Sequence, residues 1–301
     1  MTTPAPTRVR ALGAAIEAWG ASGGGATRRD DLPWRSTRDP WAVLVSETMA
    51  QQTQLSRVIP AYRRFLGSFP TPIACAEAPL GAVLIAWEGM GYNRRARDLH
   101  RAAGIVVEVH DGAVPDDLES LLALPGVGPY TARAVLAFAF EHDVGVVDTN
   151  AGRILARAAT GRPMRPTEAQ ALVDAMVPSG RGWSFGQALL DLGATVCTAN
   201  VPNCSGCPVS RRCAWTRSGR PDPDPARGSA GVSTADPPFA GSDRQGRGNL
   251  VAALRAGPVP ADALSAAAGW PDDPSRTERV VAGLVADGLA EWGASGTLRL
   301  P

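Results

Sequence analysis

Four of the five cysteines of this 301-residue chain fall within 17 residues and could together hold a metal centre. Cys197, Cys204, Cys207 and Cys213 follow the pattern C-x6-C-x2-C-x5-C. Thiolates bind zinc and iron–sulfur clusters, and structural zinc commonly uses two C-x2-C pairs, of which this pattern has one. The spacing therefore favours an iron–sulfur cluster and leaves zinc as the alternative. The fifth cysteine, Cys75, is predicted to be a buried apolar residue.

The cysteine segment is also basic. Arg211, Arg212, Arg217 and Arg220 lie in or just after it, and no acidic residue occurs between Cys197 and Arg220. A basic loop held by a metal centre could contact nucleic-acid phosphates. The alternative is that the metal centre only joins two helices.

Two carboxylates are candidates for acid–base or electrostatic catalysis. Glu47 lies in an otherwise apolar helical segment, where a carboxyl group can serve as a proton donor near neutral pH. Asp148 follows an apolar run and precedes a predicted helix, so it could be catalytic or could be an N-cap residue. For Glu47 the alternative is a buried side chain bonded to a helix end.

A glycine-rich turn lies between two predicted helices at residues 124–132 (LPGVGPYTA). Backbone amides of Gly126, Val127 and Gly128 would face outward at the start of the second helix. Such a helix–hairpin–helix suits a DNA phosphate and reads no base sequence. An ordinary helical hairpin is the alternative.

The elements that must position these residues are helical, and the pattern predicts an all-α fold. Apolar residues recur with helical spacing, and Pro and Gly separate the segments. Short strand-like runs occur only at 144–147 and 297–300. The predicted helices are residues 41–53, 93–109, 115–124, 129–140, 149–159, 167–177 and 184–192.

The chain is predicted to change character after residue 217. Residues 218–243 are rich in Pro, Asp and Gly and read as an extended linker between a main domain, 1–217, and a small module, 244–301. The module shows three short predicted helices (249–255, 261–268 and 276–287) and a hairpin (289–300). This is the outline of a winged helix, and the alternative is a helical tail packed on the main domain.

Composition limits the chemistry. The chain contains no lysine, which excludes a Schiff base with a lysine side chain. The net charge is +1, but residues 1–220 hold 23 Arg against 19 acidic residues and residues 221–301 hold 7 against 10. No apolar run of about 18 residues and no secretory leader are recognisable, so a cytoplasmic protein without a membrane span is expected.

Taken together, these motifs resemble those of the helix–hairpin–helix DNA glycosylases with an iron–sulfur cluster, and most closely the MutY-type adenine glycosylases. The resemblance spans about residues 32–213. Its matching segments are residues 32–35 (LPWR), 41–47 (WAVLVSE), 51–54 (QQTQ), 87–96 (WEGMGYNRRA), 124–132, 147–150 (VDTN) and the four cysteines.

The resemblance implies two helical lobes with DNA in the cleft, a [4Fe-4S] cluster on the four cysteines, and extrusion of a mispaired adenine from the duplex. It implies that Glu47 protonates the adenine and that Asp148 stabilises the developing sugar cation, with Tyr130 and Asn150 in support. A monomer acting on DNA in the bacterial nucleoid is expected. The residues expected to contact DNA are Arg35, Gln52, Tyr92, Arg94, Arg95, Gly126, Val127, Gly128, Arg211 and Arg212.

The chain also departs from related families. Tyr130 stands where the endonuclease III class has its strand-cleaving lysine, which favours a monofunctional glycosylase. Ala50, Pro129 and Thr149 differ from the usual residues, and the 58 residues from 244 onward are too few for the Nudix-like domain of typical members. Residues 239–248 are similar to a segment of shortened bacterial members. The remaining alternatives are a glycosylase for thymine or uracil opposite guanine, and a catalytically silent DNA-binding or redox-sensing protein.

Overall fold

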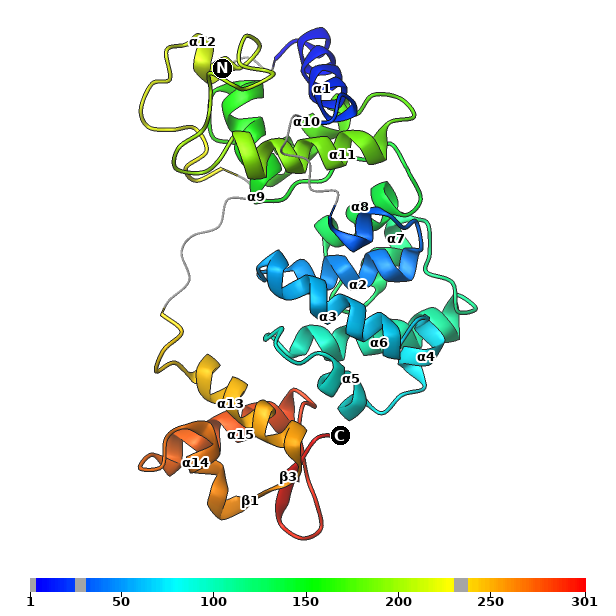
Figure 1. Ribbon diagram of the computed structural model, residues 1–301, viewed down its shortest axis with the longest axis vertical. Coiled ribbons are helices and arrows are strands. Elements are labelled where there is room, and N and C mark those ends of the chain that lie inside the picture. The colour runs from blue at the N-terminus through cyan, green and yellow to red at the C-terminus, as the bar shows by residue number, and fades with distance from the viewer. Residues whose placement is uncertain (1–3, 25–30, 230–237) are drawn as a thin grey trace. The chain divides into compact units, whose positions relative to one another are not determined.

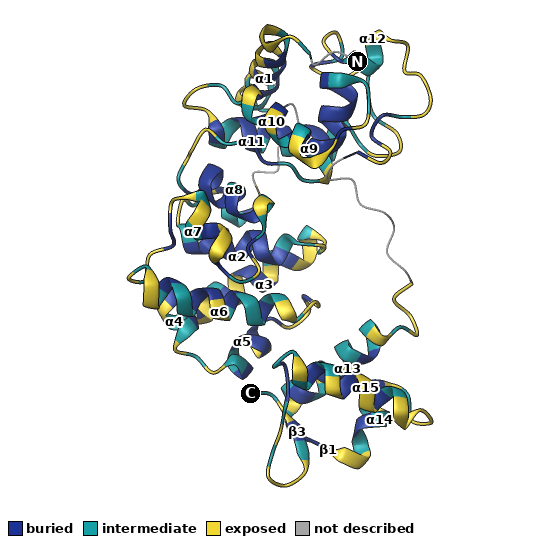
Figure 2. Ribbon diagram, turned by 180° about the vertical axis from the view of Figure 1, so that it is seen from behind, coloured by how far each residue is buried: buried dark blue, intermediate teal, exposed yellow. Residues whose placement is uncertain are grey.

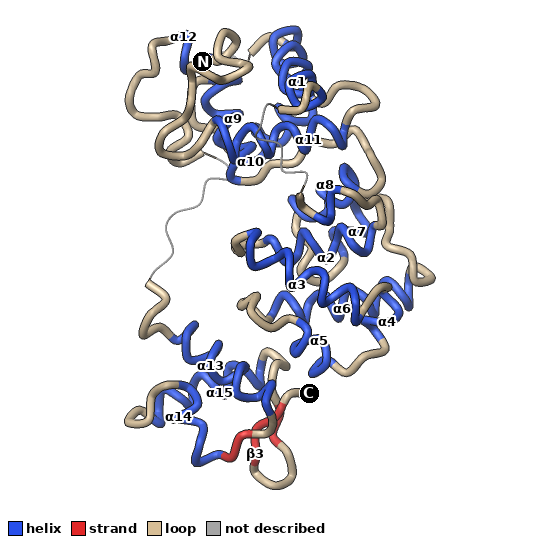
Figure 3. The backbone as a smooth tube through the Cα atoms, viewed as in Figure 1, coloured by secondary structure: helices blue, strands red, loops and turns tan. Residues whose placement is uncertain are grey.

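The computed structural model describes residues 4–24, 31–229 and 238–301 (Figure 1). Helices dominate it, and the three short strands of the described residues all lie near the C-terminus (Figure 3). The expected all-α class is confirmed. The elements are α1 (Pro6–Ala21), η2 (Pro33–Arg35), α2 (Pro40–Ala50), α3 (Leu55–Ser68), α4 (Pro72–Ala76), α5 (Leu80–Ala86), α6 (Arg94–Val109), α7 (Leu118–Ala123), α8 (Pro129–Phe138), α9 (Thr149–Ile154), η3 (Leu155–Thr160), α10 (Pro166–Met176), α11 (Gly182–Asp191), η4 (Leu192–Val196), α12 (Ala214–Arg217), α13 (Asp243–Ala256), β1 (Val259–Pro260), η5 (Ala261–Ala263), α14 (Leu264–Ala268), α15 (Pro274–Ala286), β2 (Glu291–Trp292) and β3 (Thr297–Arg299).

The strand expected at 144–147 is absent, and both backbone groups of Gly145 bond to side chains of α10 instead of a neighbouring strand. The Gly145 amide donates to Asp174 Oδ1 at 2.8 Å, and its carbonyl accepts from Gln170 Nε2 at 3.0 Å. A Cβ on Gly145 would lie 2.4 Å from Val173. The segment is therefore an irregular connection fixed to α10. The helix expected from 115 begins at Leu118, and the one expected to reach 53 ends at Ala50.

The described residues form two compact units. The first contains residues up to 43, 116–118 and 128–229, and it holds α1 and α8–α12. Its core joins α1 to α10 and α11 through Ile16, Val173 and Phe185, which are fully buried. Gly13 permits the close approach of α1, since a Cβ there would lie 1.9 Å from the Met176 carbonyl oxygen.

The second unit contains residues 44–115, 119–127 and 238–301. It includes most of α2, whose side chains are buried over nearly their whole length (Figure 2). Leu44, Val45 and Met49 have no exposed surface. The helix that carries Glu47 is therefore a fixed core element of this unit.

The C-terminal module of this unit consists of α13, α14, α15 and a three-stranded antiparallel sheet in the order β1-β3-β2. The three helices and the hairpin expected from the sequence are present, and β1 adds a strand that was not expected. Leu250, Val251, Leu284 and Leu298 form its small core.

The module is also fixed to α5 and α6. Arg97 Nη1 donates to the Asp287 carbonyl at 2.6 Å, Arg255 Nε donates to the Leu84 carbonyl at 2.8 Å, and the Gly81 amide donates to the carbonyl of Pro301 at 2.8 Å. It therefore has features of both alternatives, a small domain and a tail packed on the rest of the chain.

The first half of the predicted linker is not extended. Arg157 Nε donates to Asp224 Oδ1 at 3.0 Å, Ser229 Oγ accepts from the Met164 amide at 3.1 Å, and Ala226 is 5% exposed. The composition of residues 218–229 suggested a free linker, but a buried arginine needs a carboxylate partner, and Asp224 supplies it. Residues 230–237 lie outside the described residues. Among the helices that the structure describes, none is both long and apolar enough to span a membrane.

Candidate active site and metal centre

The four predicted ligand cysteines line one cavity in the first unit. The apolar side chains of Leu192, Val196 and Val209 line the same cavity. The π-helical turn η4 ends directly before Cys197, and Cys213 directly precedes α12, so two structured segments bring the first and last thiols together. In the described parts of the chain, no three His, Cys, Asp or Glu side chains are grouped to hold a single metal ion. The four thiols line a common space, and such a set of thiolates can bind zinc or an iron–sulfur cluster.

Burial governs the proton affinity of these thiols. It raises the pKa of Cys207 to about 11, and it raises the pKa of Cys197 against the opposing effect of the neighbouring Arg157 guanidinium. Without a metal both sulfurs keep their protons at neutral pH. Binding of a metal centre would therefore release protons, and metal affinity should fall as the pH falls.

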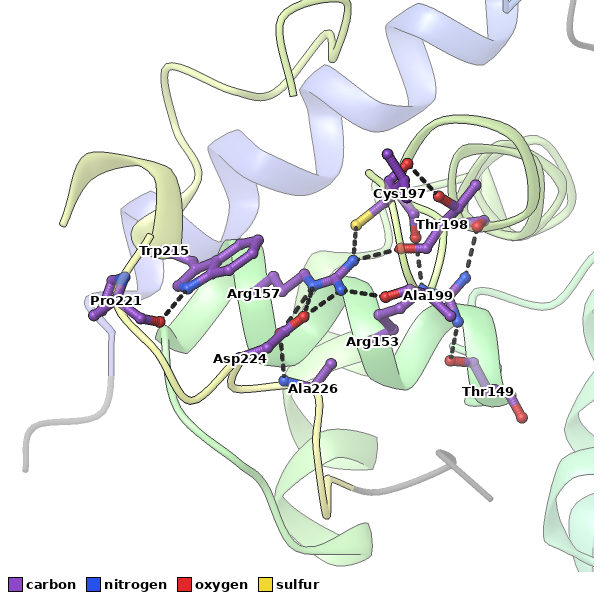
Figure 4. A network of polar contacts seen from close by, with 12 residues as sticks. Thr149, Arg153, Arg157, Cys197, Thr198, Ala199, Trp215, Pro221, Asp224 and Ala226 are labelled. Atoms are coloured by element: carbon purple, nitrogen blue, oxygen red, sulfur yellow. Dashed lines mark hydrogen bonds and ion pairs between the residues drawn. The ribbon is translucent and has the colours of Figure 1, made fainter. Parts of the chain in front are cut away.

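Arg157 bonds both to the cysteine loop and to Asp224 (Figure 4). Its guanidinium donates to Cys197 Sγ at 3.5 Å and to the Thr198 and Ala199 carbonyls at 2.7 and 2.9 Å, and it pairs with Asp224. The indole of Trp215 lies 5.1 Å from the same guanidinium. A charged hydrogen-bond donor at a ligand sulfur stabilises its thiolate form.

Asp148 is both an N-cap and the first member of a hydrogen-bond chain. Its Oδ1 accepts from the Ala151 amide at 2.7 Å, and its Oδ2 accepts from Asn150 Nδ2 at 2.9 Å. Asn150 Oδ1 accepts from Arg153 at 2.7 Å, and Arg153 Nε donates to the Cys197 carbonyl at 2.6 Å. The chain therefore runs from the carboxylate to the backbone of the first cysteine.

Burial raises the pKa of Asp148, and the bonds from Ala151 and Asn150 oppose this rise. A carboxylate withdrawn from water but held by two donors can exert a strong field on a nearby cation. Gly193 allows this packing, since a Cβ there would lie 2.5 Å from Asn150 Cβ.

Glu47 lies in α2 in the second unit and is 8% exposed, between the buried side chains of Ser46 and Thr48. The guanidinium of Arg95 closes the C-terminal end of α2 by donating to the carbonyls of Thr48, Met49 and Gln51. A cation at a helix C-terminus satisfies the last carbonyls and the helix dipole. Burial lowers the pKa of Arg95 to about 10. Arg95 thus holds the backbone at the end of α2, and the DNA contact expected of it stays a prediction.

The two residues predicted to fill the opened base stack have unusual backbones. Gln52 has φ of 53° and Tyr92 has φ of 45°, in the left-handed region that non-glycine residues seldom adopt. Arg95 fixes both loops, because it also donates to Thr53 Oγ1 and to the Met90 carbonyl. Tyr92 is 42% exposed. Locally strained and exposed residues of this kind are frequent at functional sites.

The predicted DNA-binding turn has left-handed backbone at Gly126, whose φ is 75°. A Cβ at this position would lie 2.9 Å from Asp98 Cβ. The Val127 amide donates to the Leu124 carbonyl at 3.1 Å and closes the turn, so it is not the outward donor that was expected. Gly128 is the N-cap residue of α8 and provides no side-chain cap.

The other arginines predicted to contact DNA differ in their surroundings. Arg94 is 62% exposed at its side chain and pairs with Asp287 of the C-terminal module at 2.7 Å. Arg211 and Arg212 are exposed on the cysteine loop. Tyr130, a predicted catalytic residue, is half-buried in the first turn of α8.

Arg35 is a structural residue. It is 8% exposed, and its two terminal nitrogens donate to the two carboxylate oxygens of Asp191 at 2.8 and 2.7 Å. A bidentate pair at this depth is neutralised internally. Asp191 thus matches the charge of Arg35 within the first unit, and the DNA contact expected of Arg35 stays a prediction.

Replacing Arg35 with alanine should destabilise the protein by about 3–5 kcal/mol, because Asp191 would stay buried without its partner. Arg38→Ala is the matched control, since its pair with Glu141 is 40% and 57% exposed and, with the Trp183 ring 4.1 Å away, should contribute at most about 2 kcal/mol. Denaturant unfolding measures both. Equal losses would contradict the distinction.

Four residues that contact the cysteine loop or Arg157 were not predicted from the sequence, namely Arg153, Arg157, Asp224 and Trp215. Arg153 and Arg157 are 5% and 1% exposed in an otherwise apolar stretch. Their spacing of four residues on one helix face was the available signal. Two charges on an apolar face need buried acceptors, and the cysteine loop provides them as backbone carbonyls.

The chain is similar in sequence to known DNA repair proteins. Residues 45–178 match the model of the HhH-GPD superfamily of base excision DNA repair proteins. The adenine DNA glycosylase of Mycobacterium tuberculosis is 42% identical over 280 residues, covering 90% of this chain and 89% of the relative. That of Mycolicibacterium smegmatis is 41% identical over 276 residues, covering 90% and 92%.

Solved structures give the same fold. A thermostable thymine-DNA glycosylase matches with a TM-score of 0.63 and 27% identity, covering 70% of this chain and 98% of that one. Endonuclease III in a non-covalent DNA complex matches with a TM-score of 0.60 and 22% identity, covering 73% and 99%. At that identity the second match shows the fold alone.

Proposed function

This chain belongs to the adenine DNA glycosylases of the HhH-GPD superfamily of base excision DNA repair proteins, and from that premise we propose that it hydrolyses the N-glycosidic bond of adenine mispaired with 8-oxoguanine or guanine. The observation that carries the proposal is the 42% identity over nine-tenths of the chain, with both candidate carboxylates in place. The similarity to the thymine-DNA glycosylase, at 27% identity, supports the alternative function, which is removal of a different mispaired base.

In the proposed reaction the target nucleotide is extruded from the duplex, because its glycosidic bond is out of reach inside the stack. Glu47 donates a proton to the adenine and makes it a better leaving group. Asp148 stabilises the oxocarbenium-like sugar through its negative charge as the protonated adenine leaves. A water molecule then adds to the anomeric carbon and gives its proton to the Glu47 carboxylate, which leaves an abasic site. Asn150 fixes the Asp148 carboxylate by the 2.9 Å bond to Oδ2, and Tyr130 supports the acid.

We assign a [4Fe-4S] cluster to Cys197, Cys204, Cys207 and Cys213, on the basis of a donor set of four thiols around one cavity. The cluster supplies a folding centre for the loop, and Arg157 and Arg153 hold the surrounding backbone. The proposed DNA contacts are Gln52, Tyr92 and the backbone of Gly126 and Gly128, with Arg94, Arg211 and Arg212 at phosphates. The proposed domains are residues 1–217 and 244–301, and we propose a monomer that acts on the chromosome in the cytoplasm.

Incubation with a duplex holding adenine opposite 8-oxoguanine should leave abasic sites that break only after hot alkali. The chain contains no lysine, so borohydride should trap no lysine adduct with the sugar. Gel analysis with and without alkali measures this. Strand nicking before alkali would contradict a monofunctional enzyme.

The control panel for this experiment contains duplexes with A:T, A:G, T:G and U:G pairs. Excision confined to the adenine mispairs supports the proposal. Excision of thymine or uracil instead would favour the alternative function, and no excision from any duplex would favour the silent DNA-binding protein.

A further inference from the structure

The C-terminal module has little charge to offer a DNA backbone. Residues 238–301 contain six Arg and seven acidic residues. Arg247 pairs with Asp287, Arg276 with Asp243, and Arg255 donates to the Leu84 carbonyl. A module that bound phosphates unspecifically would present a positive face. If it contacts DNA, the contact must be local and of another kind.

One turn of the module exposes an aromatic ring on a firmly bonded backbone. Phe239 is 58% exposed. Its carbonyl accepts from the Ser242 amide at 3.2 Å and from Ser242 Oγ at 2.6 Å. The Gly241 amide donates to Gln245 Oε1, and its carbonyl accepts from Arg276, both at 2.7 Å. The hydrogen bonds of this turn therefore hold the exposed phenyl ring on a fixed backbone.

Arg244 links this ring to the proposed DNA-contacting loop. Its guanidinium lies 6.0 Å from the Phe239 ring, and its Nη1 donates to Tyr92 Oη at 3.3 Å. Tyr92 is itself exposed and lies in the loop fixed by Arg95. Two aromatic side chains and the arginine between them are therefore neighbours within the second unit, and the module is fixed to α5 and α6 by three backbone-directed bonds.

We propose that Phe239 stacks on the base opposite the target adenine, with Arg244 holding it in register with Tyr92, so that the C-terminal module reads the complementary strand. An aromatic ring on a fixed turn is the usual platform for an unstacked base. The adjacent guanidinium adds a donor for base or phosphate oxygens. This inference rests on the proposed function, because it takes the Tyr92 loop to be the DNA-contacting one.

The test removes the Phe239 side chain and the opposite base, separately and together, and compares the effects on DNA binding. Binding of the full-length protein is measured with duplexes that carry non-hydrolysable 2′-fluoro-deoxyadenosine opposite either 8-oxoguanine or a tetrahydrofuran abasic analogue. Phe239→Ala should weaken binding to the first duplex about 5- to 150-fold, as expected from the loss of one aromatic–base stack. It should change binding to the second less than twofold, since no base is there to stack on.

Trp292→Ala is the matched control, because Trp292 is 47% exposed in the same module, and it should change neither affinity. Equal losses on both duplexes, or no loss on either, would overturn the proposal. Wild-type excision of adenine opposite 8-oxoguanine is measured first. Its absence would refute the proposed function, whereas its presence with an inert Phe239→Ala would refute only the role of Phe239.

Discussion

Asp148→Asn should lower adenine excision by about 10²–10³-fold, because it removes the negative charge that stabilises the sugar cation. Asparagine keeps the N-cap, since its carbonyl oxygen can still accept from the Ala151 amide. It loses the second acceptor, which receives Asn150 Nδ2 at 2.9 Å. Single-turnover excision and duplex binding are the measurements. Binding should persist or tighten, because a negative charge near phosphates is removed.

The control for this variant is Asp143→Asn, another aspartate that accepts backbone amides. Asp143 receives the amides of Gly180, Arg181 and Gly182 at 2.7 to 3.1 Å at the start of α11. It has no proposed catalytic role, so excision should stay within a few-fold of wild type. Wild-type excision by Asp148→Asn would reduce that residue to a helix cap and would remove the proposed mechanism.

Glu47→Gln, the change at the other proposed catalytic carboxylate, should also lower adenine excision. It keeps the size and the hydrogen-bonding outline but cannot donate the proton, and loss of a general acid costs about 10²–10⁴-fold. The pH profile separates the two roles. Asp148 must be ionised and its pKa is raised by burial, so its acid limb should lie above the ordinary aspartate value of about 3.9. Activity should fall as the pH falls through that raised pKa, and this limb should be missing from the residual activity of Asp148→Asn.

The sequence predicted seven helices of the main domain and the grouping of the four cysteines, because these signals are local, but it did not predict α1, α3, α4 or α5. Apolar spacing marks a helix face, and cysteine spacing marks a shared centre. The roles of individual arginines could not be predicted, because a guanidinium binds phosphates, carboxylates and carbonyls with the same donors. Arg35 pairs with Asp191 and Arg95 holds backbone carbonyls, and both partners depend on tertiary packing that the sequence does not display.

Asp148 illustrates a different limit. The sequence offered two roles for it, a cap and a catalytic group, and the structure shows that the cap is formed. The two roles are compatible, since one oxygen accepts from Ala151 and the other from Asn150. The four-residue spacing of Arg153 and Arg157 was visible, but only the fold shows that one leads to Asp148 and the other to Asp224.

Cys204→Ser should cost both the cluster and the active-site geometry. The wild-type protein should be brown, with broad absorption at about 400 nm and about four irons per chain. The variant lacks one of four ligand sulfurs around the cavity, so it should lose that absorption and yield much less soluble protein. Cys75→Ala is the control, because Cys75 is fully buried, away from the cavity, and burial raises its pKa to about 12. It should keep its iron.

Any soluble Cys204→Ser protein should also excise adenine poorly, although Cys204 is not a catalytic residue. The Cys197 carbonyl accepts from Arg153, which in turn holds Asn150 and through it Asp148. A loop without its metal centre releases that carbonyl, so the loss should exceed the roughly 10–100-fold typical of changes just outside a metal site. Metal analysis decides the cofactor, since stoichiometric zinc in a colourless wild-type protein would contradict the cluster. Full excision by an iron-free variant would show that Asp148 is held without the cysteine loop.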